Sequence, residues 1–324
     1  NAVFAMLVAA AIWFTADGVT NEFLLNLMFY IIITPLLTVT LTKIMFNSEN
    51  KMVVSDAISR IDSVMSMKPL SQGSAPVKPA DYSVELRNVS YSYDGSKKAL
   101  DGISLKIGSG QTCAFVGPSG GGKTTLANII SRFFDADSGE VLIGGRNADS
   151  FDPEELRMKI GVVPQKAVLF KGTIRENMQW GKSDATDEEI MAAAKTAQAA
   201  DVIEGKGGLD YEIEQGGKNL SGGQRQRFTI ARALVRKPEI LILDDSASAL
   251  DFATDAALRK AIREMDSDPT VFIVSQRTSS IQHADKIIVL DDGKIVGIGR
   301  HDELLENCPV YSEIYNSQFK KEAV

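Results

Sequence analysis

Two apolar runs open the chain. The first, Ala2–Thr15, carries no charge, and after a short polar loop (Ala16–Glu22) a second run extends over Phe23–Phe46. Crossing a bilayer core takes about 20 helical residues, so the first run is too short to span it, whereas the second is long enough. Pro35 and scattered threonines are compatible with a membrane helix. We therefore expect one complete spanning helix, preceded by the remnant of another.

Charges beside these runs predict their orientation. The loop carries Asp17 and Glu22 and no Lys or Arg, whereas four basic residues follow later, namely Lys43, Lys51, Arg60 and Lys68. By the positive-inside tendency the loop faces outward and the rest of the chain is cytosolic, which predicts a multi-pass protein of the plasma membrane. A cleaved signal peptide is the alternative, but two apolar segments joined by a hairpin-sized loop do not fit that layout.

The pattern changes twice after the second run. Helical spacing of apolar residues over Ser48–Met67 predicts that the helix continues into the cytosol, and the Pro-, Ser- and Gly-rich segment Lys68–Pro79 predicts a linker. Short β-branched runs then alternate with amphipathic stretches, which indicates an α/β domain with a largely parallel sheet and an antiparallel flap formed by its first strands. The expected strands are Ser83–Tyr93, Gly102–Ile107, Thr112–Val116, Lys159–Val163, Glu239–Leu243, Val271–Val274 and Lys286–Leu290.

Composition narrows the possible partners. The 324 residues carry a formal charge of −7, with no basic tract that would favour nucleic acid, so we expect none as a partner. Cys113 and Cys308 lack metal-ligand spacing and are expected to be reduced structural thiols. Because the chain begins with Asn1 rather than Met and enters apolar sequence at once, we expect it to be the tail of a longer polypeptide.

A glycine-rich loop carries the strongest chemical signal. It follows the expected strand Thr112–Val116, precedes a helical stretch expected over Thr125–Phe134, and has the P-loop pattern. In such a loop, backbone N–H groups surround a phosphate, Lys123 reaches the β- and γ-phosphates, and the Thr124 hydroxyl coordinates Mg²⁺. The residues expected to bind ATP here are Gly117, Pro118, Ser119, Gly120, Gly121, Gly122, Lys123, Thr124 and Thr125.

A second segment complements this loop. The apolar run Ile240–Asp244 predicts a buried strand that ends in a carboxylate, the position at which a P-loop fold holds hydrated magnesium. Strands ending in Asp are common, so this pattern gains its meaning from its pairing with the P-loop. Together they predict ATP and Mg²⁺ as ligands, with Asp244 at the metal.

Between these segments lies Asn219–Arg227, whose sequence NLSGGQRQR resembles the signature of the ATP-binding cassette (ABC) family. The resemblance extends from Asp81 to the end of the chain. It implies an ABC ATPase with an antiparallel β subdomain and a helical subdomain. It also implies that two cassettes sandwich two nucleotides, so that Ser221, Gly222, Gly223 and Gln224 contact ATP held by the opposing cassette.

Further segments are similar to family motifs. The resemblance implies that Tyr93 stacks on adenine, although an aromatic residue near a strand is more often part of the core. It also implies that Gln165 reaches magnesium and contacts the membrane domain. Ser248–Asp251 is similar to the loop that crosses the dimer interface, and Glu214–Gly217 occupies the place of an exporter-type segment that touches helices of the partner.

Two positions depart from the family pattern. The family's catalytic glutamate is replaced by Asp245, and its phosphate-contacting histidine by Gln276. A carboxylate withdrawn by about 1 Å can lower rates by around a hundredfold, and a neutral amide cannot carry the charge of an imidazole. With Gln165, these residues form the expected catalytic set, in a weakly hydrolytic site. The two histidines, His283 and His301, are expected to be ordinary surface residues. Neutral drift with activity retained is the alternative.

The helices and the cassette together predict a domain layout and a function. We expect residues 1–67 to be the last two membrane helices of a transmembrane domain with their cytosolic extension, 68–80 a linker, and 81–324 the nucleotide-binding domain. This layout favours an exporter subunit with an unidentified substrate. The two departures beside an intact signature predict a heterodimer, in which the signature serves the partner's ATP. A soluble switch in DNA repair or translation, a nucleotide-gated channel or regulator, and a slow homodimeric exporter are alternatives, although a soluble protein would not carry the Phe23–Phe46 run.

Overall fold

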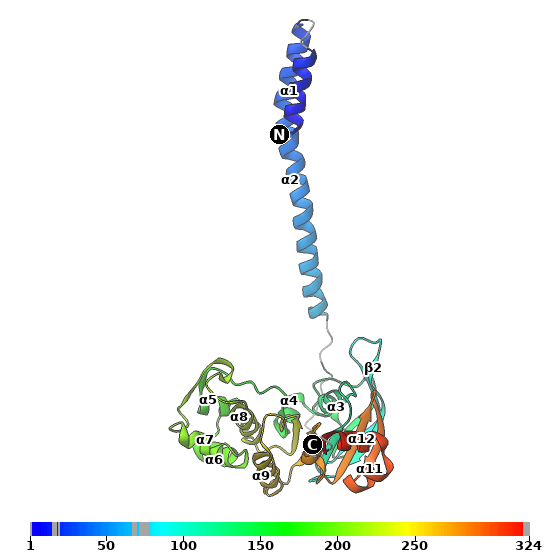
Figure 1. The fold of residues 1–324 in the computed structure, drawn as a ribbon, viewed down its shortest axis with the longest axis vertical. Helices are drawn as coiled ribbons and strands as arrows, with labels where there is room; N and C mark the ends of the chain where they lie inside the picture. The colour runs from blue at the N-terminus through cyan, green and yellow to red at the C-terminus, as the bar shows by residue number, and fades with distance from the viewer. Residues whose placement is uncertain (1, 15–17, 19, 67–69, 71–77, 320–324) are drawn as a thin grey trace. The chain divides into compact units, whose positions relative to one another are not determined.

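The computed structural model describes residues 2–14, 18, 20–66, 70 and 78–319 (Figure 1). The chain divides into two compact units, Asn1–Pro69 and Leu70–Val324. Most of the expected linker, residue 15 of the first apolar run, and residues 16, 17 and 19 of the expected loop lie outside the described residues.

The first unit is helical. It contains α1 (Ala2–Phe14) and α2 (Asn21–Met65), and α2 begins where Thr20 accepts a hydrogen bond from the Phe23 N–H at 3.2 Å. The helix starts at Asn21, within the expected loop, and runs unbroken through Pro35. In the described part of the chain, α2 is the one helix long and apolar enough to cross a membrane. Its threonine hydroxyls are satisfied within the helix, as Thr38, Thr40 and Thr42 each donate to the carbonyl four residues earlier at 2.8 Å.

The second unit is built on a six-stranded sheet with the order β12-β11-β3-β10-β9-β6. Its strands are β3 (Thr112–Val116), β6 (Ile160–Val163), β9 (Ile240–Asp244), β10 (Thr270–Val274), β11 (Lys286–Asp291) and β12 (Lys294–Gly299). The five strands from β11 to β6 are parallel, and β12 joins as an antiparallel edge. Because β3, β9 and β10 are buried along their whole length, they are continuous apolar runs rather than alternating ones.

A separate four-stranded antiparallel sheet has the order β2-β1-β4-β5. It comprises β1 (Val84–Ser92), β2 (Lys98–Ile107), β4 (Ser138–Ile143) and β5 (Arg146–Asn147). This confirms the expected antiparallel flap. However, β2 begins at Lys98 rather than at Gly102. Lys98 and Leu100 also pair with β1, beyond a shift in the register of the two strands. Strand β4 was not expected, because its first three residues are exposed and lack an apolar pattern.

Helices complete the second unit (Figure 1). A helical part is formed by α5 (Ile174–Gln179), α6 (Asp187–Thr196), α7 (Ala200–Gly205) and α8 (Gly222–Leu234), together with the small hairpin β7 (Gly172–Thr173) and β8 (Glu212–Ile213). The remaining helical elements are α3 (Lys123–Ile130), η1 (Ala148–Ser150), α4 (Pro153–Lys159), η2 (Gln215–Gly217), α9 (Phe252–Arg263), α10 (Thr278–Ile281), α11 (His301–Asn307) and α12 (Pro309–Phe319).

Two hydrophobic cores lie on opposite faces of the main sheet. Along β3, Cys113 and Phe115 pack with the core under the antiparallel sheet, whereas Ala114 and Val116 pack with the core of the helical part. This alternation is the two-residue period of a strand. Both cysteines are free and buried, and burial raises the pKa of the Cys113 thiol, which keeps it protonated and unreactive. The carboxyl ends of β3, β9 and β10 thus stand at one rigid edge, where the loops that follow them meet.

Two local expectations are corrected. The helix expected over Thr125–Phe134 is α3, which starts at Lys123 after Gly122 (φ 97°) and ends at Ile130, shortly before Arg132 takes a left-handed backbone at φ 55°. His301 is not an ordinary surface residue: it is half-buried, and its Nδ1 shares a 2.7 Å hydrogen bond with the buried Tyr311 hydroxyl.

Candidate functional site

The glycine-rich loop is shaped by close backbone packing. Gly117 has φ 151°, and a Cβ there would lie 1.9 Å from the Leu290 carbonyl oxygen. At Gly122, with φ 97°, a Cβ would lie 2.6 Å from the Ala99 carbonyl oxygen. Both positions require glycine. The loop between β3 and α3 therefore packs closely against β11 and β2, which restricts its backbone to this conformation.

Lys123, the first residue of α3, turns its side chain back over this loop. Its ammonium donates to the carbonyls of Gly117 at 2.9 Å and Pro118 at 2.7 Å, and the residue is buried. Desolvation lowers the pKa of Lys123, and the nearby Asp244 and Asp245 oppose that shift. The loop thus holds a buried cation at the point where an anionic ligand would enter.

Thr124 and Asp244 bring two hard oxygen ligands together. The Thr124 hydroxyl donates to the Asp244 carboxylate at 3.2 Å, and Asp244 is the buried last residue of β9. Burial raises the pKa of Asp244; the Thr124 hydrogen bond opposes this, Asp245 adds to it, and Lys123 opposes it. No group of three or more His, Cys, Asp or Glu side chains fit to hold a metal occurs in the described ranges. One carboxylate and one hydroxyl nevertheless fit Mg²⁺, which takes its other ligands from water and phosphate.

The raised pKa of Asp244 predicts a stability effect. Because the folded protein favours the protonated carboxyl, ionised Asp244 costs stability at pH values above its ordinary 3.8, and the cost disappears below that value. Asp244→Asn keeps an oxygen for the Thr124 hydroxyl and removes the charge, so we expect the melting temperature at pH 7 to rise by about 2 °C. Thermal unfolding at several pH values measures this. A rise that persisted unchanged at pH 3 would contradict the charge explanation.

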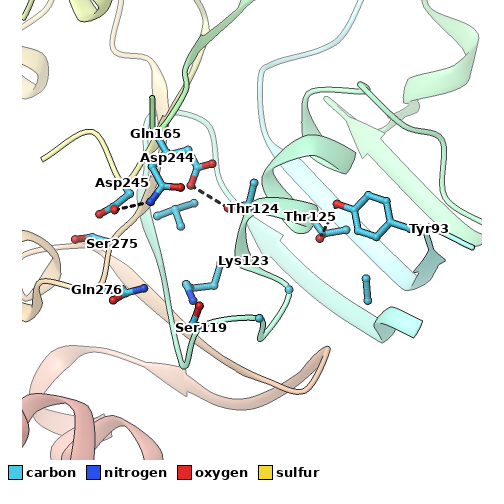
Figure 2. Close-up of a pocket in the computed structure, with 14 residues that line it drawn as sticks. Tyr93, Ser119, Lys123, Thr124, Thr125, Gln165, Asp244, Asp245, Ser275 and Gln276 are labelled. Carbon is cyan, nitrogen blue, oxygen red and sulfur yellow. Dashed lines mark hydrogen bonds between the residues drawn. The ribbon is translucent and has the colours of Figure 1, made fainter. Parts of the chain in front are cut away.

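Asp245 and Gln165 face each other beside this pair. The Gln165 side-chain amide donates to the Asp245 carboxylate at 3.1 Å, as Figure 2 shows. Asp245 has a left-handed backbone, φ 47°, and its N–H donates to the Val274 carbonyl at 2.8 Å. Aspartate tolerates this conformation better than most residues. The contact brings together two residues that are 80 positions apart in the sequence.

A pocket of about 320 Å³ collects these side chains. Gln276 follows β10 and reaches toward Ser119 and Lys123 (Figure 2). The lining residues are Tyr93, Ala99, Ser119, Gly120, Gly122, Lys123, Thr124, Thr125, Gln165, Asp244, Asp245, Val274, Ser275 and Gln276. The structure therefore assembles in one hollow Asp244, Asp245, Gln165, Gln276 and six of the nine expected loop residues. Gly117, Pro118 and Gly121 are not among the residues that line it.

Tyr93 stands at the far end of this pocket. Its ring is 60% exposed, which excludes the core interpretation. The Tyr93 hydroxyl and the Thr125 hydroxyl share a 3.0 Å hydrogen bond, and Tyr91 and Phe134 contact the Tyr93 ring edge to face at 5.1 and 5.8 Å. These contacts fix the ring while leaving it accessible to a planar ligand.

The expected signature lies elsewhere in the unit. Ser221 caps α8: its hydroxyl accepts from the Gln224 N–H at 3.2 Å, and its own N–H donates to the Gln224 side chain at 3.0 Å. Ser221 and Gly222 are exposed, and Ser221–Gln224 are not among the residues lining the pocket. The structure does not bring the signature to this chain's own glycine-rich loop.

The comparison with protein families agrees with this geometry. Residues 100–248 match the family model described as "ABC transporter", a span that contains the glycine-rich loop, the signature and Asp244. The chain carries an ABC ATPase domain. The expected fold class, an ABC ATPase with antiparallel β and helical parts behind an N-terminal helical segment, is therefore confirmed.

Individual relatives of this ABC ATPase domain are exporters by name. The chain is 43% identical over 248 residues to a "Putative multidrug export ATP-binding/permease protein" of Staphylococcus aureus, covering 76% of this chain and 43% of that protein. It is 44% identical over 252 residues to an "ATP-dependent lipid A-core flippase" of Desulfotalea psychrophila, covering 78% of this chain and 43% of that protein. The chain thus spans less than half the length of these relatives.

A solved structure is also similar. The "Structure of a bacterial Atm1-family ABC exporter with ATP bound" superposes with a TM-score of 0.76 at 32% identity, covering 98% of this chain and 57% of that one. This likeness includes the N-terminal helices as well as the ABC ATPase domain.

One contact of the ABC ATPase domain was not expected from the sequence. Arg277, next to Gln276, donates to the carbonyls of Ala247 and Leu250 at 3.0 Å each and of Ser248 at 2.8 Å. It joins the segment after β10 to the expected interface loop Ser248–Asp251. The position of Arg277 beside Gln276 was the one hint in the sequence. Its partners are main-chain carbonyls brought to it by the tertiary structure, so the contact itself could not be predicted.

Proposed function

We propose that this chain is the ATP-binding subunit of an ATP-driven ABC exporter in the plasma membrane. The observation that carries the proposal is that Lys123, Thr124 and Asp244 line one pocket. The loop that precedes Lys123 has a backbone path that requires glycine at positions 117 and 122. The exporter names of the relatives and the apolar helix α2 support the transport assignment. We assign residues 1–67 to the end of a multi-pass transmembrane domain, 68–80 to a linker and 81–324 to the nucleotide-binding domain.

In this proposal the pocket binds ATP with Mg²⁺. Tyr93 stacks on the adenine, the loop from Gly117 to Thr125 donates N–H groups to the phosphates, and Lys123 supplies positive charge. Thr124, Asp244 and Gln165 hold the metal. Bound Mg²⁺ would neutralise charge on the phosphate oxygens.

We further propose that this site hydrolyses ATP slowly. Asp245 is one methylene shorter than glutamate, and one of its carboxylate oxygens accepts a hydrogen bond from the Gln165 amide at 3.1 Å. Gln276 places a neutral amide at the phosphate end of the pocket. Unlike a protonated histidine, it cannot donate a hydrogen bond from a positively charged group. Both features weaken the positioning of water and the stabilisation of charge while leaving the binding groups intact.

The contrast between the altered residues Asp245 and Gln276 and the intact signature supports a heterodimer. Ser221 and Gly222 are exposed, and the capping box with Gln224 leaves the first turn of α8 regular and uncovered. A helix N-terminus of this kind favours a phosphate. In the proposed assembly, Ser221–Gln224 complete a nucleotide site on a second ABC subunit, whose own catalytic residues are intact. Closure of the two domains on ATP then moves the fused helices.

Magnesium-dependent ATP binding tests the nucleotide site. We expect the full chain in detergent to bind a fluorescent ATP analogue more tightly with Mg²⁺ than with EDTA, and Asp244→Asn to remove most of this difference, a loss of about tenfold. Asp292→Asn is the matched control, because Asp292 is 78% exposed and pairs with Lys97 away from the pocket. Equal affinities with and without Mg²⁺ in the parent protein would overturn the metal assignment.

A further inference from the structure

The last helix, α12, contacts the segment that carries Gln276. The side-chain amide of Gln318, near the end of α12, donates to the Gln276 carbonyl. Its oxygen accepts from the Thr278 N–H at 2.9 Å and from the Thr278 hydroxyl at 3.0 Å. One side chain therefore binds the backbone on both sides of Arg277, across 42 positions of sequence.

Gln318 replaces a missing local cap. The helix α10 starts at Thr278, and its N-cap residue, Arg277, makes no capping bond with its side chain. The first N–H of α10 would lack a partner within the helix, and Gln318 supplies one from α12. The Thr278 side chain is fully buried, so its hydroxyl also depends on this contact.

Helix α12 is itself firmly anchored. Tyr311 is fully buried, and its hydroxyl shares a hydrogen bond with His301 on α11. Burial, with Tyr315 and Asp302 nearby, raises the pKa of Tyr311 to about 12, so this hydroxyl stays protonated. Val310 and Ile314 pack on the same core. The contact from Gln318 therefore links a fixed helix to the segment 275–278.

The linked segment connects the pocket with the interface loop. Gln276 and Ser275 line the pocket, and Arg277 binds the carbonyls of Ala247, Ser248 and Leu250. A displacement of this segment would move the Gln276 side chain at the phosphate end of the site. It would also break the hydrogen bonds from Arg277 that hold the interface loop.

We propose that Gln318 is a positioning residue, through which the C-terminal helix sets the place of Gln276 at the γ-phosphate end of the nucleotide site. This deepens the proposed function and rests on it. Gln276 lies beside Ser119 and Lys123, whereas Tyr93, the proposed adenine contact, stands at the other end of the pocket (Figure 2). The tether would therefore act on the difference between ATP and ADP rather than on nucleotide binding as such.

The test uses the full chain with Gln318→Ala. We expect hydrogen exchange of the Thr278 amide to accelerate by about tenfold, and affinity for MgATP to fall by about threefold to tenfold while affinity for MgADP is unchanged. Gln318→Glu keeps the acceptor for Thr278 and loses the donor to Gln276, so it should preserve protection of the Thr278 amide and still weaken MgATP. The matched control is Asn316→Ala, whose exposed amide bonds only to Ser312 on the same helix among the described residues.

The outcomes separate the two proposals. Faster exchange at Thr278 with unchanged MgATP and MgADP affinities would show a purely structural contact and overturn the positioning role. Equal losses for MgATP and MgADP would overturn it too, by showing a general effect on the pocket. Absence of MgATP binding in the parent chain would defeat the proposed function itself, while exchange at Thr278 would still report the tether.

Discussion

Replacing Lys123 with methionine is expected to lower the affinity for MgATP by at least about a hundredfold. The side chain would keep its methylene packing, but the loop would lose the ammonium that now donates to the Gly117 and Pro118 carbonyls. A charge that faces a phosphate in a desolvated pocket is worth several kcal/mol, and about 2.7 kcal/mol corresponds to a hundredfold. Equilibrium binding of a fluorescent ATP analogue to the full chain measures the loss.

Stability separates this effect from unfolding. Burial disfavours the charge of Lys123 and lowers its pKa, so removing the ammonium relieves a cost that offsets the loss of its two hydrogen bonds. The melting temperature should therefore stay close to that of the parent. Lys98→Met serves as the control, since Lys98 is 60% exposed and pairs with Asp101 on the antiparallel sheet. Parent-like affinity in Lys123→Met would show that the loop does not bind the phosphates.

The candidate site was predictable because its parts are local. A strand, a glycine-rich turn and a helix in sequence fix the geometry from β3 to α3, and the close approach of Gly117 to Leu290 shows why substitutions are restricted there. The strand ending at Asp244 was likewise recognisable, because four apolar residues in a row are followed by an aspartate. Such segments carry their structure in neighbouring residues, so sequence patterns describe them well.

Long-range contacts were not predictable from the sequence. The Gln165–Asp245 hydrogen bond joins two side chains across 80 positions, and the Gln318 tether joins a side chain to the Gln276 carbonyl across 42 positions. Neither contact has a periodic pattern. His301 was misjudged for the same reason, because its partner Tyr311 is brought to it by the turn between α11 and α12. The exposed start of β4 gave no apolar alternation, and its strand is formed by pairing with β1.

The double substitution Asp245→Glu with Gln276→His is expected to raise the ATPase rate of the full chain by about tenfold or more. Glutamate extends the carboxylate by one bond beyond its contact with Gln165, toward the pocket, and an imidazole next to Ser119 and Lys123 can carry charge at the phosphate end. A displacement of about 1 Å in a positioned group changes rates by up to a hundredfold. Phosphate release by the protein in detergent or liposomes, alone and with the proposed second subunit, measures the gain.

Two further variants separate the charge of the side chain at position 245 from its length. Asp245→Asn combined with Gln276→His lacks a carboxylate and should show no gain, whereas each single restoring substitution should give part of it. Because Asp245 has a left-handed backbone at φ 47°, glutamate there should cost about 1 kcal/mol of stability, so melting temperatures are compared in parallel. A parent rate equal to that of the double variant would show that Asp245 and Gln276 already support full hydrolysis, and the asymmetric heterodimer would then lose its basis.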